Sequence, residues 1–372
     1  MVNKDRLVEE FLRLVQIDSE SGNESEIAQY LVNQFNELGL DASEDDTKEK
    51  TGMGSGNVIA RLKGNKAADP ILFTCHMDTV TPGNGVKPVI NGDIIETDKT
   101  TVLGADDKAG IAALIEVMRL IKEEGLEHGD IELVLTTGEE VGLLGSVAAD
   151  MKSLNAKYGF ALDSGGAVGE IIIASPDHAK INAKIHGVAA HAGVAPELGV
   201  SAIEIASKAI ANMPLGRMDE ELTANIGTIQ GGERTNIVCD LVEITGEARA
   251  ITRSKLENQM ATMTKALEDA AAEMGGTVEV EVTYEDVGYK LTEDDRVIQI
   301  AKTVMNNIGR TPNLTATGGG SDANIFTVMG GIPTANLGVG YIDIHSKNEK
   351  MPITELVKIT EAIAEIIKVV AE

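Results

Sequence analysis

The sequence contains no tryptophan, and aromatic residues make up only 3% of its 372 residues. Side chains on which nucleic-acid bases or sugars stack are therefore scarce. Basic residues are also outnumbered, with 32 lysines and arginines against 59 aspartates and glutamates, so the formal net charge is −27. A chain of this charge is repelled by nucleic-acid phosphates and by anionic membranes. We expect neither nucleic acid nor membrane as a partner, and the acidity itself favours solubility.

Cysteine is nearly absent as well. The two cysteines, Cys75 and Cys239, are too few for a secreted disulfide scaffold, so we expect reduced thiols in a reducing compartment. No apolar run approaches the roughly 20 residues that a membrane-spanning helix needs. The first residues have apolar positions at helical spacing that acidic residues interrupt, which is not the pattern of a signal peptide. The sequence thus predicts a cytoplasmic protein.

Apolar segments alternate with helical patterns along much of the chain. Residues 4–38 have a helical pattern with a loop at 18–24, and a further helix is expected at 110–124. Nearly continuous apolar runs, which are typical of strands buried on both faces, lie at 57–62, 71–75, 130–136 and 158–162. Alternating elements of this kind predict an α/β domain with a mainly parallel sheet and helices on both faces.

A different pattern lies between residues 177 and 288. Strands and helices follow one another there in the order β-α-β-β-α-β, which is typical of a ferredoxin-like α+β domain. Elements at 295–308, 334–338 and 352–371 then resume the α/β pattern. We therefore predict a first domain in two parts, 1–176 and 289–372, with the ferredoxin-like domain, 177–288, inserted between them.

Polar side chains that can bind metals follow several of the predicted strands. His76 and Asp78 come at the end of the second strand, two residues apart, so on an extended chain they point to the same side. A carboxylate behind an imidazole fixes the tautomer of a histidine ligand. Asp106 and Asp107 stand between glycines at the start of a helix, where acids also serve simply as caps.

Further acids follow the next two strands. Glu139 and Glu140 are neighbours whose side chains point in different directions, so one can ligate a metal while the other faces substrate. Because ligands of open α/β sheets bind beyond the carboxyl ends of the strands, we expect these acids and Asp163 to meet His76 at one edge. His345, in a glycine-rich segment, would supply a second imidazole. Two histidines and three carboxylates suit a pair of divalent ions, in the first place Zn²⁺, or else Mn²⁺ or Co²⁺.

The other histidines differ in their surroundings. His128, His178 and His186 have no supporting motif, and we expect surface or structural positions for them. His191 lies in the turn 187–193, after the first strand of the inserted domain. A flexible turn of this kind could carry an imidazole over a site.

Together these motifs resemble those of the M20 metallopeptidases. The resemblance runs from the first helix to the last, includes the inserted domain, and is strongest to the peptidase T group of tripeptide aminopeptidases. It rests on an ordered set of residues: His76, Asp78, the segment 104–110, Glu139, Glu140, Asp163, His191 and His345.

The resemblance implies a role for each of these residues. Two metal ions would share five ligands: Asp106 bridging both, His76 and Asp163 on one ion, Glu140 and His345 on the other. Asp78 would orient His76, Glu139 would be the general base, and His191 would stabilise the oxyanion. The peptide bond between Asp106 and Asp107 would be cis.

The resemblance also implies a substrate site and a partner. The inserted domain would be a lid that carries the contact of a homodimer, and His191 would act either in its own subunit or across the dimer. Arg249 lies where the family places an arginine that binds a substrate carboxylate, although a surface ion pair is the other reading of this residue. Asn236 and Ser321 are the remaining expected substrate contacts.

Two departures from the peptidase T group concern the ends of the substrate. The segment 79–103 is short, and Gly318 stands where the group has an arginine. The expected reaction is hydrolysis of short peptides, with release of the N-terminal residue of tripeptides. A carboxypeptidase or an N-acyl-amino-acid deacylase of the same superfamily is the alternative. A non-catalytic metal-binding module is more remote, because a base such as Glu139 has little use without turnover.

Overall fold

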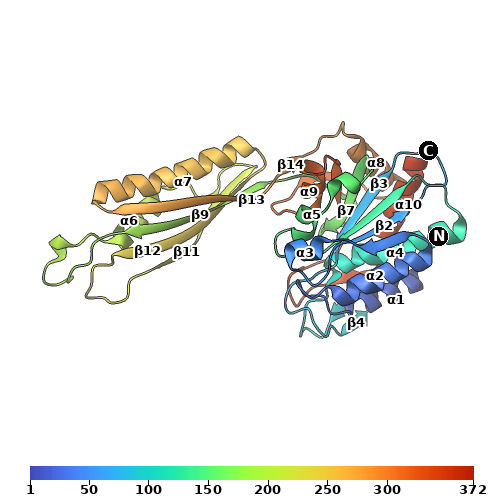
Figure 1. Cartoon of the computed structure of the whole chain (residues 1–372), viewed down its shortest axis with the longest axis horizontal. Coiled ribbons are helices and arrows are strands. Elements are labelled where there is room, and N and C mark those ends of the chain that lie inside the picture. The colour runs from blue at the N-terminus through green and yellow to red at the C-terminus, as the bar shows by residue number, and fades with distance from the viewer. The chain divides into compact units, whose positions relative to one another are not determined.

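The chain divides into two units (Figure 1). The computed structural model describes residues 1–372, except for the side chain of Asp286. Unit 1 consists of Met1–Ile173, Leu291–Thr317 and Ser321–Glu372, and unit 2 of Ala174–Lys290 and Gly318–Gly320. In Figure 1 the main segment of unit 2 is coloured from green to orange. The expected insertion, 177–288, lies within this segment.

A nine-stranded sheet is the framework of unit 1, although β14 and the last two residues of β8 belong to unit 2. Its strands lie in the order β1-β2-β6-β3-β7-β16-β8-β14, with β15 paired to β8. Their bounds are β1 Asp41–Glu44, β2 Val58–Leu62, β3 Ile71–His76, β6 Ile131–Thr136, β7 Tyr158–Ser164, β8 Glu170–Ser175, β14 Tyr289–Lys290, β15 Asn313–Ala316 and β16 Thr334–Gly338. The four central strands, β6, β3, β7 and β16, are parallel, and antiparallel pairs flank them. The chain leaves unit 1 within β8 and returns after β14.

Helices cover both faces of this sheet, which is why β3 and β6 are buried at every residue. Neighbouring residues of β3 point to opposite faces. Cys75 lies against Gly110 of α4, whereas Leu72 packs in a cluster with Phe326 of α9. The helices of unit 1 are α1 Lys4–Val15, α2 Ser25–Leu38, α3 Thr47–Thr51, α4 Ala105–Glu124, α5 Leu144–Ala148, η1 Met151–Ser153, α8 Arg296–Asn307, α9 Asp322–Val328 and α10 Ile353–Ala371. The predicted α/β class is confirmed.

Several short elements of the chain were not expected from the sequence. A three-stranded sheet is formed by β4 Pro88–Asn91, β5 Ile94–Thr97 and β17 Met351–Pro352, in the order β17-β5-β4. The strands β1, β8, β14 and β15 and the helix α9 were missed as well. Among the described residues, no helix is both long and apolar enough to cross a membrane.

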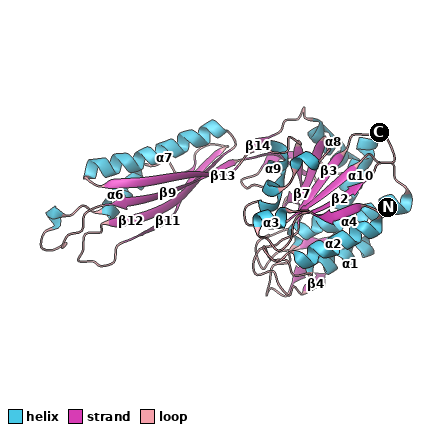
Figure 2. Ribbon diagram, in the orientation of Figure 1, coloured by secondary structure: helices cyan, strands magenta, loops and turns pink.

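Unit 2 has the ferredoxin-like order that the sequence predicts. Its elements are β9 Asp177–His186, η2 Pro196–Leu198, α6 Ala202–Asn212, β10 Gly216–Arg217, β11 Leu222–Gly231, β12 Leu241–Ala250, α7 Arg253–Met274 and β13 Thr277–Asp286. They form an antiparallel sheet in the order β10-β11-β12-β9-β13. Every second residue of β9 is buried, because only one face of the sheet is packed against α6 and α7 (Figure 2).

Candidate metal centre

Three neighbouring parallel strands of unit 1 deliver polar side chains to the same edge of the sheet. His76 is the last residue of β3, and Asp163 lies near the end of β7. Glu139 and Glu140 occupy the turn that follows β6. Asp106 enters from the first turn of α4, where its own backbone is not helical and its bond to Asp107 is cis, as the resemblance implies.

Asp106 is the centre of the cluster. One of its carboxylate oxygens, Oδ1, lies 3.0 Å from Nε2 of His76, and the other, Oδ2, lies 3.3 Å from Nε2 of His345. The same nitrogen of His345 is 2.9 Å from Oε2 of Glu140. Asp163 stands on the other side, with Oδ1 at 3.9 Å from Nε2 of His76. The structure therefore brings all five expected ligands together, two on each side of Asp106.

The chemistry of these groups fits a divalent cation. His76, Asp106 and Glu140 offer ligand atoms that all lie within 4.8 Å of one another. One buried oxygen of Glu140, Oε1, has no hydrogen-bond partner in the described part of the chain, although such an atom normally needs one. Imidazole and carboxylate donors without thiolate suit Zn²⁺ and also Mn²⁺ or Co²⁺.

The electrostatics of the cluster show an excess of buried negative charge. Burial and the neighbouring carboxylate of Asp106 raise the pKa of Asp163 well above its usual value. Burial and the charge of Asp163 do the same to the pKa of Glu139. Hydrogen bonds to Asp106 and Glu140 raise the pKa of His345 to about 10. In the absence of a cation, protons therefore compensate these carboxylates.

Asp78 connects the end of β3, which carries His76, with the turn that carries Glu139 and Glu140. Its Oδ1 accepts the backbone N–H of Glu139 at 3.0 Å, and its Oδ2 accepts the N–H of Glu140 at 3.3 Å and the hydroxyl of Ser21 at 2.7 Å. Nδ1 of His76 is 2.9 Å from the backbone carbonyl of Asp78 and 3.6 Å from its carboxylate. A proton on Nδ1 directed at this carbonyl leaves Nε2 free to ligate.

Two polar side chains of the site were missed by the sequence analysis. The hydroxyl of Tyr341 lies 3.2 Å from Oδ1 of Asp106 and 3.3 Å from Oδ1 of Asp163. The amide of Asn336 accepts the backbone N–H of Asp163 at 3.0 Å and donates to its carbonyl at 2.7 Å. An asparagine inside a buried strand, β16, was the available signal, because a buried amide must find partners. Tyr341 has no comparable signal in the sequence.

Ser321 lies in the scaffold of unit 1. Its hydroxyl caps α9 by accepting the backbone N–H of Asn324, and the Asn336 side chain donates to it at 3.2 Å. Ser321 itself is only 4% exposed. These bonds favour a structural role for the hydroxyl, and contact with substrate stays a prediction.

The three remaining expected site residues belong to unit 2, where they occupy opposite ends of the sheet. His191 pairs with Ile237 in an antiparallel bridge, and the N–H of Ala192 donates to the carbonyl of Asn236 at 3.0 Å, so His191 and Asn236 are neighbours beyond the end of β9. Arg249 on β12 is paired with His178, at the start of β9. The eight residue-to-residue steps of β9 from position 178 to its end at 186 span about 26 Å.

The guanidinium of Arg249 is engaged within unit 2. Its Nε and Nη2 lie 3.3 and 3.4 Å from the carboxylate of Glu247, and Nη1 donates to the carbonyl of Gly318 at 2.9 Å. The ion pair that the sequence left open is therefore present. Gly318, where the peptidase T group has an arginine, is a backbone partner of this arginine.

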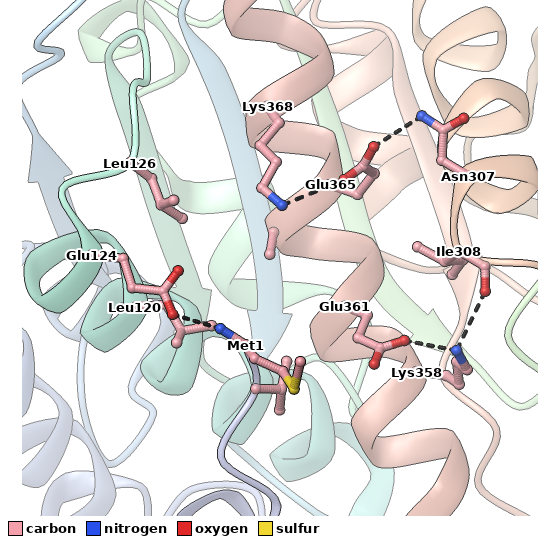
Figure 3. A pocket seen from close by; sticks show the side chains of 12 residues that line it. Met1, Leu120, Glu124, Leu126, Asn307, Ile308, Lys358, Glu361, Glu365 and Lys368 are labelled. Carbon is pink, nitrogen blue, oxygen red and sulfur yellow. Dashed lines mark hydrogen bonds and ion pairs between the residues drawn. The ribbon is translucent and has the colours of Figure 1, made fainter.

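A separate pocket of unit 1 lies near the chain termini (Figure 3). Its charged groups pair with one another: the amino group of Met1 with Glu124, Lys358 with Glu361, and Lys368 with Glu365. Glu124 ends α4, roughly 25 Å along the helix from Asp106 at its start. None of the expected site residues lines this pocket.

A two-unit α/β chain that gathers histidines and carboxylates around one shared aspartate has the organisation of a metallopeptidase. The family model for "Peptidase family M20/M25/M40" matches residues 72–369. The chain belongs to this family and is a hydrolase of peptide bonds.

Individual relatives agree with this assignment. The chain is 56% identical to the uncharacterized protein YqjE of Bacillus subtilis over all of both chains. Two crystal structures are similar over 99–100% of each chain, both with a TM-score of 0.97. One is aminopeptidase PepT from Bacillus cereus, at 53% identity, and the other is a tripeptidase from Staphylococcus aureus, at 44% identity. Further relatives carry the name peptidase T, so within the family this chain is peptidase T-like.

Proposed function

We propose that the chain is a two-metal exopeptidase that releases the N-terminal residue of tripeptides in the cytoplasm. The observation that carries the proposal is the position of Asp106, whose two oxygens face His76 and His345 separately. The similarity to an aminopeptidase and to a tripeptidase supports the choice of substrate. The two cysteines, both unpaired and buried, agree with a reducing compartment.

Five residues would hold the two ions. Asp106 would bridge them, His76 and Asp163 would complete one ligand set, and Glu140 and His345 the other. The unpartnered oxygen of Glu140 and the distances around Asp106 support this division. Zn²⁺ suits the donor set first, with Mn²⁺ or Co²⁺ as alternatives. When bound, the metal pair lowers the pKa of a water molecule and polarises the scissile carbonyl.

Glu139 would be the general base. It takes a proton from the attacking water and gives it to the leaving amine, as one carboxylate can do in both steps. The buried carboxylate of Asp78 accepts its backbone N–H at 3.0 Å and so holds the turn from which its side chain projects. Without metal, burial and the charge of Asp163 raise the pKa of this carboxyl, and the positive charge of bound metal ions would oppose this shift.

His191 would act across a homodimer formed through unit 2. Within one copy of unit 2, Arg249 pairs with His178 at the start of β9, and His191 lies beyond the other end of this strand. The strand spans about 26 Å between these two places. An extended tripeptide is only about 10 Å long. One copy of unit 2 therefore cannot place both residues on the same substrate, whereas two copies can each contribute one. Asn236, beside His191, would enter the same site.

Arg249 would bind the carboxylate at the C-terminal end of the substrate. A guanidinium can hold a carboxylate through two hydrogen bonds. A carboxypeptidase or N-acyl-amino-acid deacylase would use the same contact, so Arg249 alone does not separate these activities.

The substrate is tested with a matched series of peptides. Protein loaded with Zn²⁺, Mn²⁺ or Co²⁺ is assayed on a tripeptide, its N-acetyl derivative, its C-terminal amide and the corresponding dipeptide. The proposal predicts the highest kcat/KM for the free tripeptide and release of its N-terminal residue. Preference for the N-acetyl derivative would instead assign a deacylase or carboxypeptidase, and no turnover with any loaded metal would leave only a binding module.

A further inference from the structure

A buried carboxylate, that of Glu349, holds the loop that leads into Asp106. Its Oε2 accepts the backbone N–H groups of Leu103 at 2.7 Å and Gly104 at 2.8 Å. Its Oε1 accepts the N–H of Asp106 at 3.1 Å. Glu349 is 2% exposed, and the charge of its carboxylate acts on the buried Lys108.

The three N–H groups converge because of the backbone at Gly104. This residue has φ +70°, in the left-handed region, so successive N–H groups turn toward one point. Such a turn is a binding site for an anion. Here the anion is a side chain of the protein, and it compensates the dipoles of these N–H groups inside the fold.

Glu349 belongs to the loop that carries His345 and precedes Lys350 at the base of this loop. Ile342 and Lys350 exchange two backbone hydrogen bonds, of 2.9 and 3.0 Å, and these close the segment 342–350 at its base. His345 lies at the turn of this segment with φ +57°, a conformation that few residues other than glycine adopt. Its side chain is 49% exposed, so little packing holds the imidazole in place. Its position depends on how the base of the loop is anchored.

One side chain therefore joins the two loops that present Asp106 and His345. We propose that Glu349 is a positioning residue, which sets the spacing between Asp106 and His345 and thereby the affinity and geometry of the metal that these two residues share. The inference rests on the proposed two-metal site and goes beyond it, since Glu349 is not a ligand. Its contact is with the backbone of Asp106, and it acts through that residue.

The exchange of glutamate for glutamine is a sharp test of this role. A carboxylate can accept about four hydrogen bonds, whereas a glutamine amide has one acceptor oxygen and an NH₂ group that donates. In Glu349→Gln, this NH₂ group must face the N–H of Asp106 or those of Leu103 and Gly104. Two donors that face each other repel, so the 103–106 loop moves relative to His345 while the size of the side chain is unchanged.

Glu132 offers a matched control. It is also buried, and its Oε2 accepts two backbone N–H groups, those of Asn155 at 2.8 Å and Ala156 at 2.9 Å. It lies near the start of β6, at the other end of this strand from Glu139. Its Oε1 also pairs with Arg61 at 3.3 Å, so Glu132→Gln removes a buried carboxylate charge and this ion pair in the same unit, away from the metal ligands.

The experiment measures metal binding and coordination in the full-length protein. Dissociation constants for Zn²⁺ and Co²⁺ are measured by chelator competition, the visible spectrum of the Co²⁺ form is recorded, and thermal stability is measured for the metal-free proteins. For Glu349→Gln we expect weakening of the metal sites by about 10- to 100-fold and an altered Co²⁺ spectrum. For Glu132→Gln we expect a similar loss of stability with unchanged metal binding. Glu349→Asp keeps both oxygens on a shorter side chain and replaces the glutamine variant if that variant does not fold.

The outcomes separate the inference from the function on which it rests. Wild-type affinity and spectrum in Glu349→Gln, or in Glu349→Asp if only that variant folds, would overturn the positioning role. So would an equal loss of metal affinity in Glu132→Gln, because the effect would then follow from stability alone. Failure of the wild-type protein to bind two ions would instead contradict the proposed function.

Discussion

The carboxylate of Asp78 accepts the backbone N–H of Glu139 at 3.0 Å, so the residue two positions after His76, a proposed metal ligand, also holds the backbone of the proposed base. The second oxygen of Asp78 receives the hydroxyl of Ser21, from the loop between α1 and α2. A single buried side chain thus connects three loops of unit 1. Such partners behind the ligands decide how well a metal site is organised.

Replacement of Asp78 with asparagine should weaken the metal site. The amide would present an NH₂ group to the backbone N–H of Glu139 or Glu140, where the carboxylate has only acceptors. We expect a 10- to 100-fold loss of metal affinity, measured by chelator competition. Ser21→Ala removes one donor and keeps the carboxylate, so its effect should be smaller. Wild-type affinity in the asparagine variant would contradict this role.

Metal binding should release protons. Hydrogen bonds raise the pKa of His345 to about 10, and bonds to Asp106 and Asp78 outweigh the effect of burial and raise the pKa of His76. Both imidazoles are therefore protonated near neutral pH without metal, yet a histidine ligates only as the neutral form. Apparent affinity should thus rise with pH up to about pH 10, roughly tenfold per pH unit for each proton released.

Calorimetry in buffers of different ionisation enthalpy measures this release directly. The observed enthalpy of metal binding should change from buffer to buffer in proportion to the number of protons. Equal enthalpies in all buffers would show that the histidines are already neutral in the metal-free protein.

Action of His191 across the dimer should allow two inactive variants to complement each other. In a mixed dimer of Glu139→Gln and His191→Ala subunits, the site with an intact Glu139 receives His191 from its partner. Random mixing should restore roughly a quarter of wild-type activity, because half of the dimers are mixed and each has one complete site. Activity that stays at the level of the separate variants would place His191 in its own subunit's site or outside catalysis.

Gly110 should not tolerate alanine, although it lies inside a helix. Alanine normally stabilises a helix interior relative to glycine by about 0.5–1 kcal/mol. Here an added Cβ would lie 2.7 Å from Oδ1 of Asp107 and 2.7 Å from Sγ of Cys75, both buried between α4 and the sheet. Overpacking of this kind costs about 1–3 kcal/mol. Thermal unfolding should show a lower Tm for Gly110→Ala, and an unchanged or higher Tm would contradict the close packing.

The sequence predicts the parts of the fold that have long, regular patterns. The strands β3, β6 and β7 are continuous apolar runs, and the helices α1, α2 and α10 have apolar residues at helical spacing. These patterns define the α/β class. The helix α9 was missed because it has only seven residues and follows a run of glycines. The strands β4, β5 and β17 are short and depend on pairing between segments far apart in the chain, which a local pattern does not contain.

In the candidate site, too, some residues are visible as local motifs and others only through contacts with distant parts of the chain. Histidines and paired acids at strand ends, such as His76 and Glu139, are visible as motifs because their residue types are unusual there. Glu349 and Tyr341 contact residues that are more than 200 positions away in the sequence. A single glutamate or tyrosine in a loop forms no motif that would mark it as part of a site. Only the folded structure shows that Glu349 meets three backbone N–H groups 243 to 246 positions away.

The two-metal mechanism is tested most directly by Glu139→Gln. Metal content and tripeptide hydrolysis are measured on the same preparations of variant and wild-type protein. The account predicts two ions per subunit in both proteins and a loss of kcat by roughly 10²–10⁴-fold in the variant, because glutamine cannot accept the proton of the attacking water. A variant that keeps wild-type kcat, or that loses its metal, would contradict the assignment of Glu139 as a base that is not a ligand.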